Sequence, residues 1–231
     1  PTGRKLAPEF AATLDRMLRD DPTLPNERAA VALVHLRSMM PMSRGIPRIE
    51  SWAQRYFDRG RARGLAISQL VAAETLLAYE GERLSASDAT EAARLLWQAA
   101  QGGSGRALFY LGALTEAGTL PGGRERAAEL FSEAVDMWEP DAAAHLFRLW
   151  TQGIATPRAT GRARTQLDRQ LLGMAARGDS PLGLYLVAQQ SLSAAGNSRG
   201  AQIRAEQFFQ RAAALGHPQA IQWCRSNGVA Y

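Results

Sequence analysis

ARLLWQAAQGGSGRALFYLGALTEAG, residues 93–118, has a counterpart near the end of the chain in AEQFFQRAAALGHPQAIQWCRSNGVAY, residues 205–231. Each segment has a helical pattern that ends in Ala-Ala, then a glycine break, then a new helical pattern with alanine four residues after the glycine. A repeat unit of this kind must stack on its neighbours to bury its apolar face. The two segments therefore predict a chain built from repeated pairs of helices.

The same pattern recurs along most of the sequence. With the glycine break as position zero, equivalent positions lie 35 to 40 residues apart, at Gly64, Gly103, Trp138, Gly178 and Gly216. Positions −8, −7, +4 and +8 are mostly apolar or small, and +4 and +8 share one helix face. No stretch alternates with the period of a strand. We therefore predict an all-α fold, an α-solenoid of antiparallel helix pairs, with units starting near 64, 103, 138 and 178 and a capping helix from 216.

The unit that begins at Gly103 resembles the Sel1-like branch of the tetratricopeptide superfamily. That family carries G-x-x-x-A-x-x-x-L-G-x-x-Y-x-x-G, followed by a second helix with A-x-x-W/F-x-x-A-A. Thr115 replaces the tyrosine, and the matching positions are Gly103, Ala107, Leu111, Gly112 and Gly118. The unit at Trp138 keeps Ala142, Leu146 and Gly153, with Trp150 in the tyrosine position. The loops lack the family's G-x-G-V-x-x-D, so a general tetratricopeptide-like fold is the broader alternative.

The charge is distributed unevenly. The net charge is +5; residues 1–63 carry 12 Lys or Arg against 7 Asp or Glu, whereas residues 64–231 carry 15 of each. We divide the chain accordingly into a basic N-terminal helical cap with a divergent first unit, residues 1–63, and the repeats, residues 64–231. The cap has predicted helices at 7–20 and 27–40. It and the arginine cluster of residues 158–177 are either solvated surface or contacts for an acidic partner, lipid or nucleic acid.

The sequence offers little for catalysis or for a cofactor. The three histidines lie in different units, and the single cysteine, Cys224, occupies a core column, so we predict a packed thiol and no metal site. The run Gly102–Gly105 lacks the strand and the Gly-Lys-Ser/Thr of a phosphate loop and is better explained as a turn. We predict no catalytic residue, no cofactor and no transmembrane segment. Because the chain begins at Pro1 without Met, a signal peptide or an anchor upstream stays open.

One column of the repeat suggests where a partner binds. Position +7 carries a ring in four of five units, at Tyr110, His145, Tyr185 and Trp223. In the tetratricopeptide family the corresponding face of the first helices lines a concave groove, so the resemblance places these rings along a groove. Packing between units is the competing explanation. The charged residues predicted to flank the rings are Arg106 and Asp141 at +3 and Glu74 and Arg148 at +10.

The resemblance implies a protein-protein interaction scaffold or adaptor rather than an enzyme. Its partner would be a protein or peptide segment held in the groove. Bacterial Sel1-like proteins commonly serve in envelope assemblies, secretion, signalling or polysaccharide export, which favours the periplasm or cell envelope over the cytoplasm. The alternative is a nucleic-acid-binding basic helical repeat. The neutral balance over residues 64–231 argues against it, since nucleic-acid affinity requires a positive surface.

Overall fold

The computed structural model describes residues 66–78, 85–155, 160–196 and 198–231. Within these ranges the regular structure consists of nine α-helices and no strand. The chain divides into two compact units, residues 1–104 and 105–231, each described by itself below. The helices predicted at 7–20 and 27–40, and the predicted boundary at residue 63, lie outside the described residues.

The described part of the first unit is one helix pair. α5 (Ala66–Ala78) packs against α6 (Ala86–Gln101), with Ala73, Leu95 and Leu96 almost fully buried. Ser85 caps α6, because its hydroxyl accepts a hydrogen bond from the backbone N–H of Asp88 at 3.1 Å. Such a cap satisfies one of the free N–H groups of the first turn. The helix therefore begins before Asp88.

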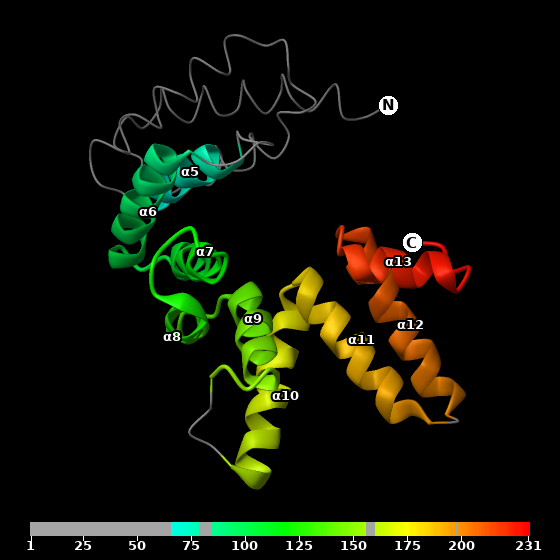
Figure 1. Ribbon diagram of the computed structural model, residues 1–231. Coiled ribbons are helices and arrows are strands. Elements are labelled where there is room, and N and C mark those ends of the chain that lie inside the picture. The colour runs from blue at the N-terminus through cyan, green and yellow to red at the C-terminus, as the bar shows by residue number, and fades with distance from the viewer. Residues whose placement is uncertain (1–65, 79–84, 156–159, 197) are drawn as a thin grey trace, which may run out of the picture. The chain divides into compact units, whose positions relative to one another are not determined.

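The second unit continues the succession of helix pairs and ends in a single helix (Figure 1). Its helices are α7 (Gly105–Glu116), α8 (Gly123–Asp136), α9 (Pro140–Thr151), α10 (Gly161–Arg177), α11 (Pro181–Ala195), α12 (Arg199–Ala214) and α13 (Pro218–Ser226). α7 pairs with α8, α9 with α10 and α11 with α12, while α13 packs on α12. α9 also contacts α11, so the first helices of these two pairs are neighbours. The predicted all-α succession of helix pairs is confirmed.

Every second helix, α6, α8, α10 and α12, ends in the same hydrogen-bonded turn. The N–H of one turn residue donates to the carbonyl three residues earlier, and the next N–H donates to the carbonyl five residues before it. This pair of hydrogen bonds satisfies free carbonyl groups at the end of the helix and requires a positive φ at the first of the two donor residues. The residues in that conformation are Gly103 (φ 90°), Trp138 (φ 62°), Asp179 (φ 54°) and Gly216 (φ 87°).

Position zero of the fourth unit is therefore Asp179, and the prediction of Gly178 was wrong by one residue. The next helix begins two residues after position zero in each case, at Gly105, Pro140, Pro181 and Pro218. The corrected register places Gly183, not Leu182, at position +4. It also moves Tyr185 from +7 to +6, the position that Phe109 occupies in its own unit.

Small residues let consecutive helices approach closely at each turn. The alanines four residues before and four residues after position zero are fully buried wherever they occur. In the fourth unit the later alanine is replaced by Gly183, whose added Cβ would lie only 2.4 Å from the Cβ of Ala175. Backbone contact of this kind explains why small residues recur in the +4 column.

The tryptophans differ widely in exposure. Trp138 is 75% exposed and Trp97 is 41% exposed, so neither is a buried packing residue. Trp150 is half-buried, and the guanidinium of Arg164 lies 5.2 Å from its ring centroid. Trp52 lies outside the described residues. Cys224 is fully buried, which confirms the packed thiol.

Candidate protein-binding face

Two of the charged residues predicted beside the rings, Arg106 and Asp141, come together at the start of α7 and α9. Arg106 on α7 forms ion pairs with Glu139, at 3.0 Å, and with Asp141. Its guanidinium carbon lies 5.0 Å from the ring centroids of both Phe109 and Tyr110. Partial burial opposes the charge of Arg106, but the hydrogen bond with Asp141 and the charges of Tyr110, Asp141 and Glu139 together outweigh burial and raise the pKa of the guanidinium. Arg106 is thus a fixed cation on an aromatic surface.

His145, on α9, belongs to the same group of rings. Its imidazole lies 5.4 Å from the ring of Phe109, edge to face, and 5.1 Å from the ring of Phe131 on α8. Phe109 in turn contacts Tyr110 at 5.5 Å. Since a quarter of the His145 side chain remains exposed, this cluster is partly core and partly surface.

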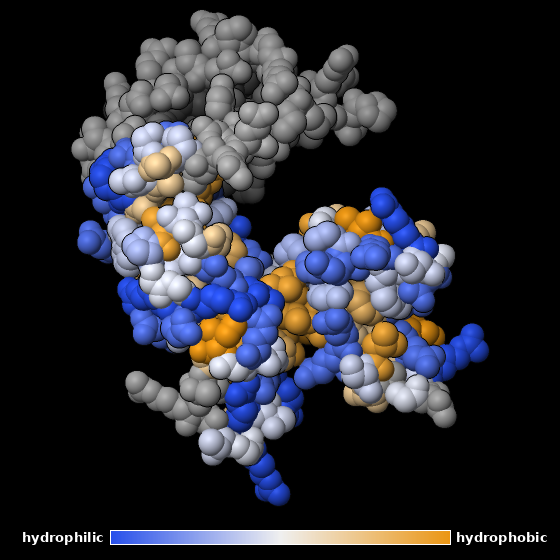
Figure 2. Space-filling model, viewed as in Figure 1, coloured by the Kyte–Doolittle hydropathy of each residue, from blue (hydrophilic) through white to orange (hydrophobic). Residues whose placement is uncertain are grey.

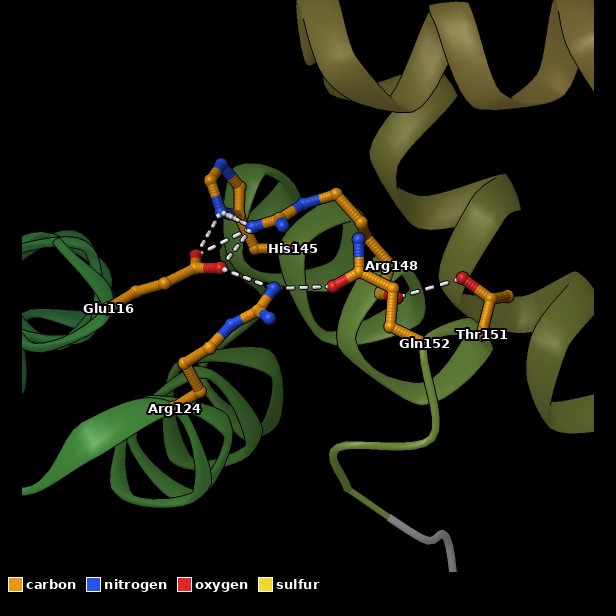
Figure 3. Close-up of polar contacts among 6 residues, drawn as sticks. All are labelled: Glu116, Arg124, His145, Arg148, Thr151 and Gln152. Atoms are coloured by element: carbon orange, nitrogen blue, oxygen red, sulfur yellow. Dashed lines mark hydrogen bonds and ion pairs between the residues drawn. The ribbon is translucent and has the colours of Figure 1, made fainter.

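A carboxylate that was not among the predicted site residues, that of Glu116, contacts both His145 and Arg148 (Figure 3). Glu116, at the end of α7, accepts two hydrogen bonds from Nη2 of Arg148, at 2.7 and 2.6 Å. Nδ1 of His145 lies 3.3 Å from the same carboxylate, and Nη2 of Arg124 lies 3.6 Å away. Arg124 also donates to the side-chain oxygen of Gln152. Glu116 therefore joins α7, α8 and α9 through one side chain.

The surroundings of Glu116 keep it ionised. Burial alone would raise its pKa, but the hydrogen bonds and charges of His145 and Arg148 outweigh burial and lower the pKa to about 2. Two guanidinium groups face this one carboxylate, so the cluster has an excess of positive charge. Arg148 is only 24% exposed and Glu116 only 14%, which fixes the position of that charge.

The last two predicted rings form a second cluster, at the end of the chain. Tyr185 on α11 stacks on His217 at 4.4 Å and meets Phe209 edge-on at 5.8 Å. Trp223 on α13 stacks on the same Phe209 ring, with 4.1 Å between the ring centroids. Both predicted rings are half-buried. His217 caps α13 through its Nδ1, and burial lowers the pKa of its imidazole.

The fold of the chain has counterparts among solved structures. No family model matches the sequence, and no curated protein matches it. A Sel1 repeat protein from Oxalobacter formigenes is similar over 97% of this chain and 87% of that chain, at 17% identity and a TM-score of 0.62. The chain has the Sel1-like repeat fold. A second similar structure is c5321, a protective antigen of uropathogenic Escherichia coli with an SLR fold; it matches 87% of this chain and 42% of that one, at 18% identity and a TM-score of 0.57.

The glycine of the Leu-Gly pair, Gly112, has a clear structural role in this fold. An added Cβ at Gly112 would lie 2.6 Å from the ring of Phe131, so glycine leaves the space into which that ring packs on α7. Phe131 in turn supports the imidazole of His145. The Leu-Gly pair of the family motif therefore shapes the aromatic cluster as well as the core.

The structure divides the eight predicted site residues among three places. Five of them gather on α7 and α9: Arg106, Tyr110, Asp141, His145 and Arg148. Tyr185 and Trp223 share the second cluster through Phe209. Glu74 is half-buried on α5 of the first unit, so its place in the row stays a prediction. Sequence reasoning missed Glu116 and Glu139, which form ion pairs with predicted residues, and Arg124, which pairs with Glu116.

The surface around these clusters is mixed in polarity. Figure 2 shows an apolar patch near α9 and α11, beside strongly hydrophilic areas of the second unit. Among the described residues no group of three or more histidine, cysteine or acidic side chains has the arrangement of a metal site. No helix in the described ranges is long and apolar enough to cross a membrane.

Proposed function

We propose that this protein is a non-catalytic scaffold that holds a segment of a partner protein on the first-helix face of its second unit. We define that face by α7, α9, α11 and α13. The observation that carries the proposal is that the aromatic and charged side chains of this face are half-exposed, while contacts inside the chain fix their positions. Aromatic and arginine side chains of this kind are the usual anchors of protein interfaces.

The chemistry of the face indicates what kind of segment fits it. The rings of Tyr110, His145 and Trp223 offer apolar contact, while Arg148 and Arg124 leave a positive excess beside Glu116. A segment that carries both apolar side chains and a carboxylate matches this pattern. Little conformational entropy is lost on binding, because the side chains are already held in place.

The Sel1-like repeat fold supports the proposal at a coarser level, because proteins with this fold typically act as interaction scaffolds and are generally not catalytic. A place in a bacterial envelope, secretion or polysaccharide-export assembly belongs to the same proposal. It rests on the resemblance alone.

Affinity capture from the native host with two matched variants tests the proposal. The face variant carries Tyr110→Ala and Tyr185→Ala, and the control carries Ile203→Ala, which lies 47% exposed on the second helix α12. We expect proteins captured by the unaltered chain to be retained by the control and lost from the face variant, with the melting temperature of the face variant preserved. Equal capture by both variants, or a face variant that loses binding only because it unfolds, overturns the proposal.

A further inference from the structure

The neutral charge of the repeats conceals a separation of charge along the second unit. Residues 105–141 carry 3 arginines and 7 acidic residues, whereas residues 142–231 carry 10 arginines and 3 acidic residues. Two of those three acids are already paired, Asp168 with Arg164 and Asp179 with Arg211. The excess positive charge of residues 142–231 therefore has few partners within its own part of the chain.

Part of this excess forms a stripe on the solvent face of α10, which we call the arginine stripe: Arg162, Arg169 and Arg177. All three are exposed, and none makes an ion pair with another described residue. They lie within about 80° of one another around the helix axis, on the side away from the buried Leu171 and Ala175. Gly173 leaves the middle of the stripe without a side chain, and the guanidinium of Arg177 lies close to it.

The equivalent helix of the preceding pair carries the opposite charge at a similar spacing. We call this the acidic stripe of α8: Glu125, Glu129, Glu133 and Asp136. All four are exposed and share an arc of about 80° on the side away from the core. Arg126 pairs with Glu129 and Glu133, but these contacts are exposed and the stripe keeps an excess of negative charge.

The two stripes match in spacing as well as in sign. Arg169 and Arg177 are eight residues apart, about 12 Å along a helix, and Glu129 and Asp136 are seven residues apart, about 10.5 Å. Between them lie small residues, Gly173 on α10 and the exposed Ser132 on α8, which let two helices approach. No ion pair joins α8 to α10 within the described part of the chain.

We propose that the arginine stripe of one chain docks on the acidic stripe of a second copy. The two surfaces are different patches of the same molecule, so the association is head-to-tail. It continues from copy to copy unless the rotation between copies closes it into a ring. A second copy is favoured over nucleic acid because the chain itself carries a surface of matching charge and spacing. The arginine stripe also has no exposed aromatic side chain between its members on which a base would stack.

Sedimentation of the full chain at several concentrations and two salt levels provides the first test. We expect the mean mass to rise with concentration at about 0.1 M salt and to return to the monomer at about 1 M, where charges more than about 3 Å apart are screened. A chain that stays monomeric at all concentrations in low salt overturns the proposal. Association that is unchanged by salt overturns it too, because it would not depend on charge.

Charge-exchanged variants identify the two surfaces. One variant carries Arg162→Glu, Arg169→Glu and Arg177→Glu; the other carries Glu125→Arg, Glu129→Arg and Asp136→Arg. Each alone is expected to remain monomeric with unchanged helical content, whereas an equimolar mixture of the two regains association. Arg204→Glu, an exposed reversal on α12, serves as the matched control and is expected to associate like the unaltered chain. Failure of the mixture to associate while each variant is folded overturns the pairing.

A short DNA duplex, added as a probe in the same experiments, tests whether the arginine stripe binds nucleic acid instead of a second copy. Retention of the association in the presence of the duplex supports the second copy. A chain that is monomeric and binds the duplex through the arginine stripe overturns the proposal in favour of nucleic acid.

Discussion

The carboxylate of Glu116 on α7 accepts both of its strong hydrogen bonds from a single nitrogen of Arg148 on α9, at 2.7 and 2.6 Å. The two residues lie on the first helices of consecutive pairs, 32 positions apart in the chain. His145 and Arg124 approach the same carboxylate. Loss of Glu116 would therefore leave three nitrogen-bearing side chains without their shared partner.

We expect Glu116→Ala to lower the free energy of unfolding by roughly 1–3 kcal/mol, because a half-buried guanidinium loses its counter-charge. Urea denaturation at neutral pH measures this loss. Glu129→Ala is the matched control: that carboxylate is 63% exposed and pairs only on the surface, so its loss should stay within about 0.5 kcal/mol. Equal losses in the two variants would show that the Glu116 cluster has no special role in stability.

The contribution of Glu116 should depend on pH in a defined window. The pKa of Glu116 falls from an ordinary 4.5 to about 2 in the folded chain. A carboxyl whose folded pKa is depressed stabilises the fold above its unfolded pKa, and that stability is lost as pH falls toward the folded pKa. The stability difference between the unaltered chain and Glu116→Gln should thus shrink between pH 4.5 and 2. A difference that stays constant across that window contradicts the assignment.

Much of the fold could be predicted because its turns recur. The glycine and alanine columns located three of the four turns correctly, at Gly103, Trp138 and Gly216. The fourth was misplaced by one residue because the glycine break was set at Gly178, whereas Asp179 has the positive φ of the turn. A better signal was present in the helix starts: a capping residue followed by proline occurs at Glu139-Pro140, Ser180-Pro181 and His217-Pro218.

The candidate site was only partly predictable. The ring column follows the spacing of the repeat units, so Tyr110 and His145 could be found from the sequence. Glu116 could not, because its contact with Arg148 depends on how α7 and α9 lie relative to each other, and no local pattern encodes that arrangement. The charge separation was hidden for a simpler reason: adding charges over residues 64–231 cancels the acidic α8 against the basic α10.

Two glycine substitutions should change stability in opposite directions. Gly183→Ala places a methyl group 2.4 Å from the Cβ of Ala175, so we expect a loss of about 1–3 kcal/mol from the forced shift of α11. Gly200→Ala on α12 meets only Nη1 of Arg204 at 3.8 Å, an ordinary contact. The better helix propensity of alanine should then stabilise the chain by up to about 1 kcal/mol. Thermal unfolding of both variants checks the pair, and a loss in both would contradict the close approach inferred at Gly183.

Trp138→Gly should leave the fold as stable as before or more stable. Trp138 has a φ of 62°, which costs a residue with a Cβ roughly 1–2 kcal/mol, and its side chain is 75% exposed and returns little by packing. Glycine adopts this conformation freely, as Gly103 and Gly216 do in the equivalent turns. Trp97→Gly is the comparison, since glycine inside α6 should cost about 1 kcal/mol. A marked loss of stability in Trp138→Gly would mean that the exposed ring makes contacts important for the fold.

The thiol of Cys224 should react only when the C-terminal helices open. The side chain is fully buried, and burial together with the charge of Glu206 raises its pKa. Because the thiolate is the reactive form, labelling with a disulfide reagent near pH 8 should be slow in the native chain and should accelerate in denaturant. Ser226 lies two residues away and is exposed, so Ser226→Cys in a Cys224→Ser background should label at once. Rapid labelling of Cys224 in the native chain would show that α13 detaches from α12 far more readily than its stacked rings, Phe209 and Trp223, lead us to expect.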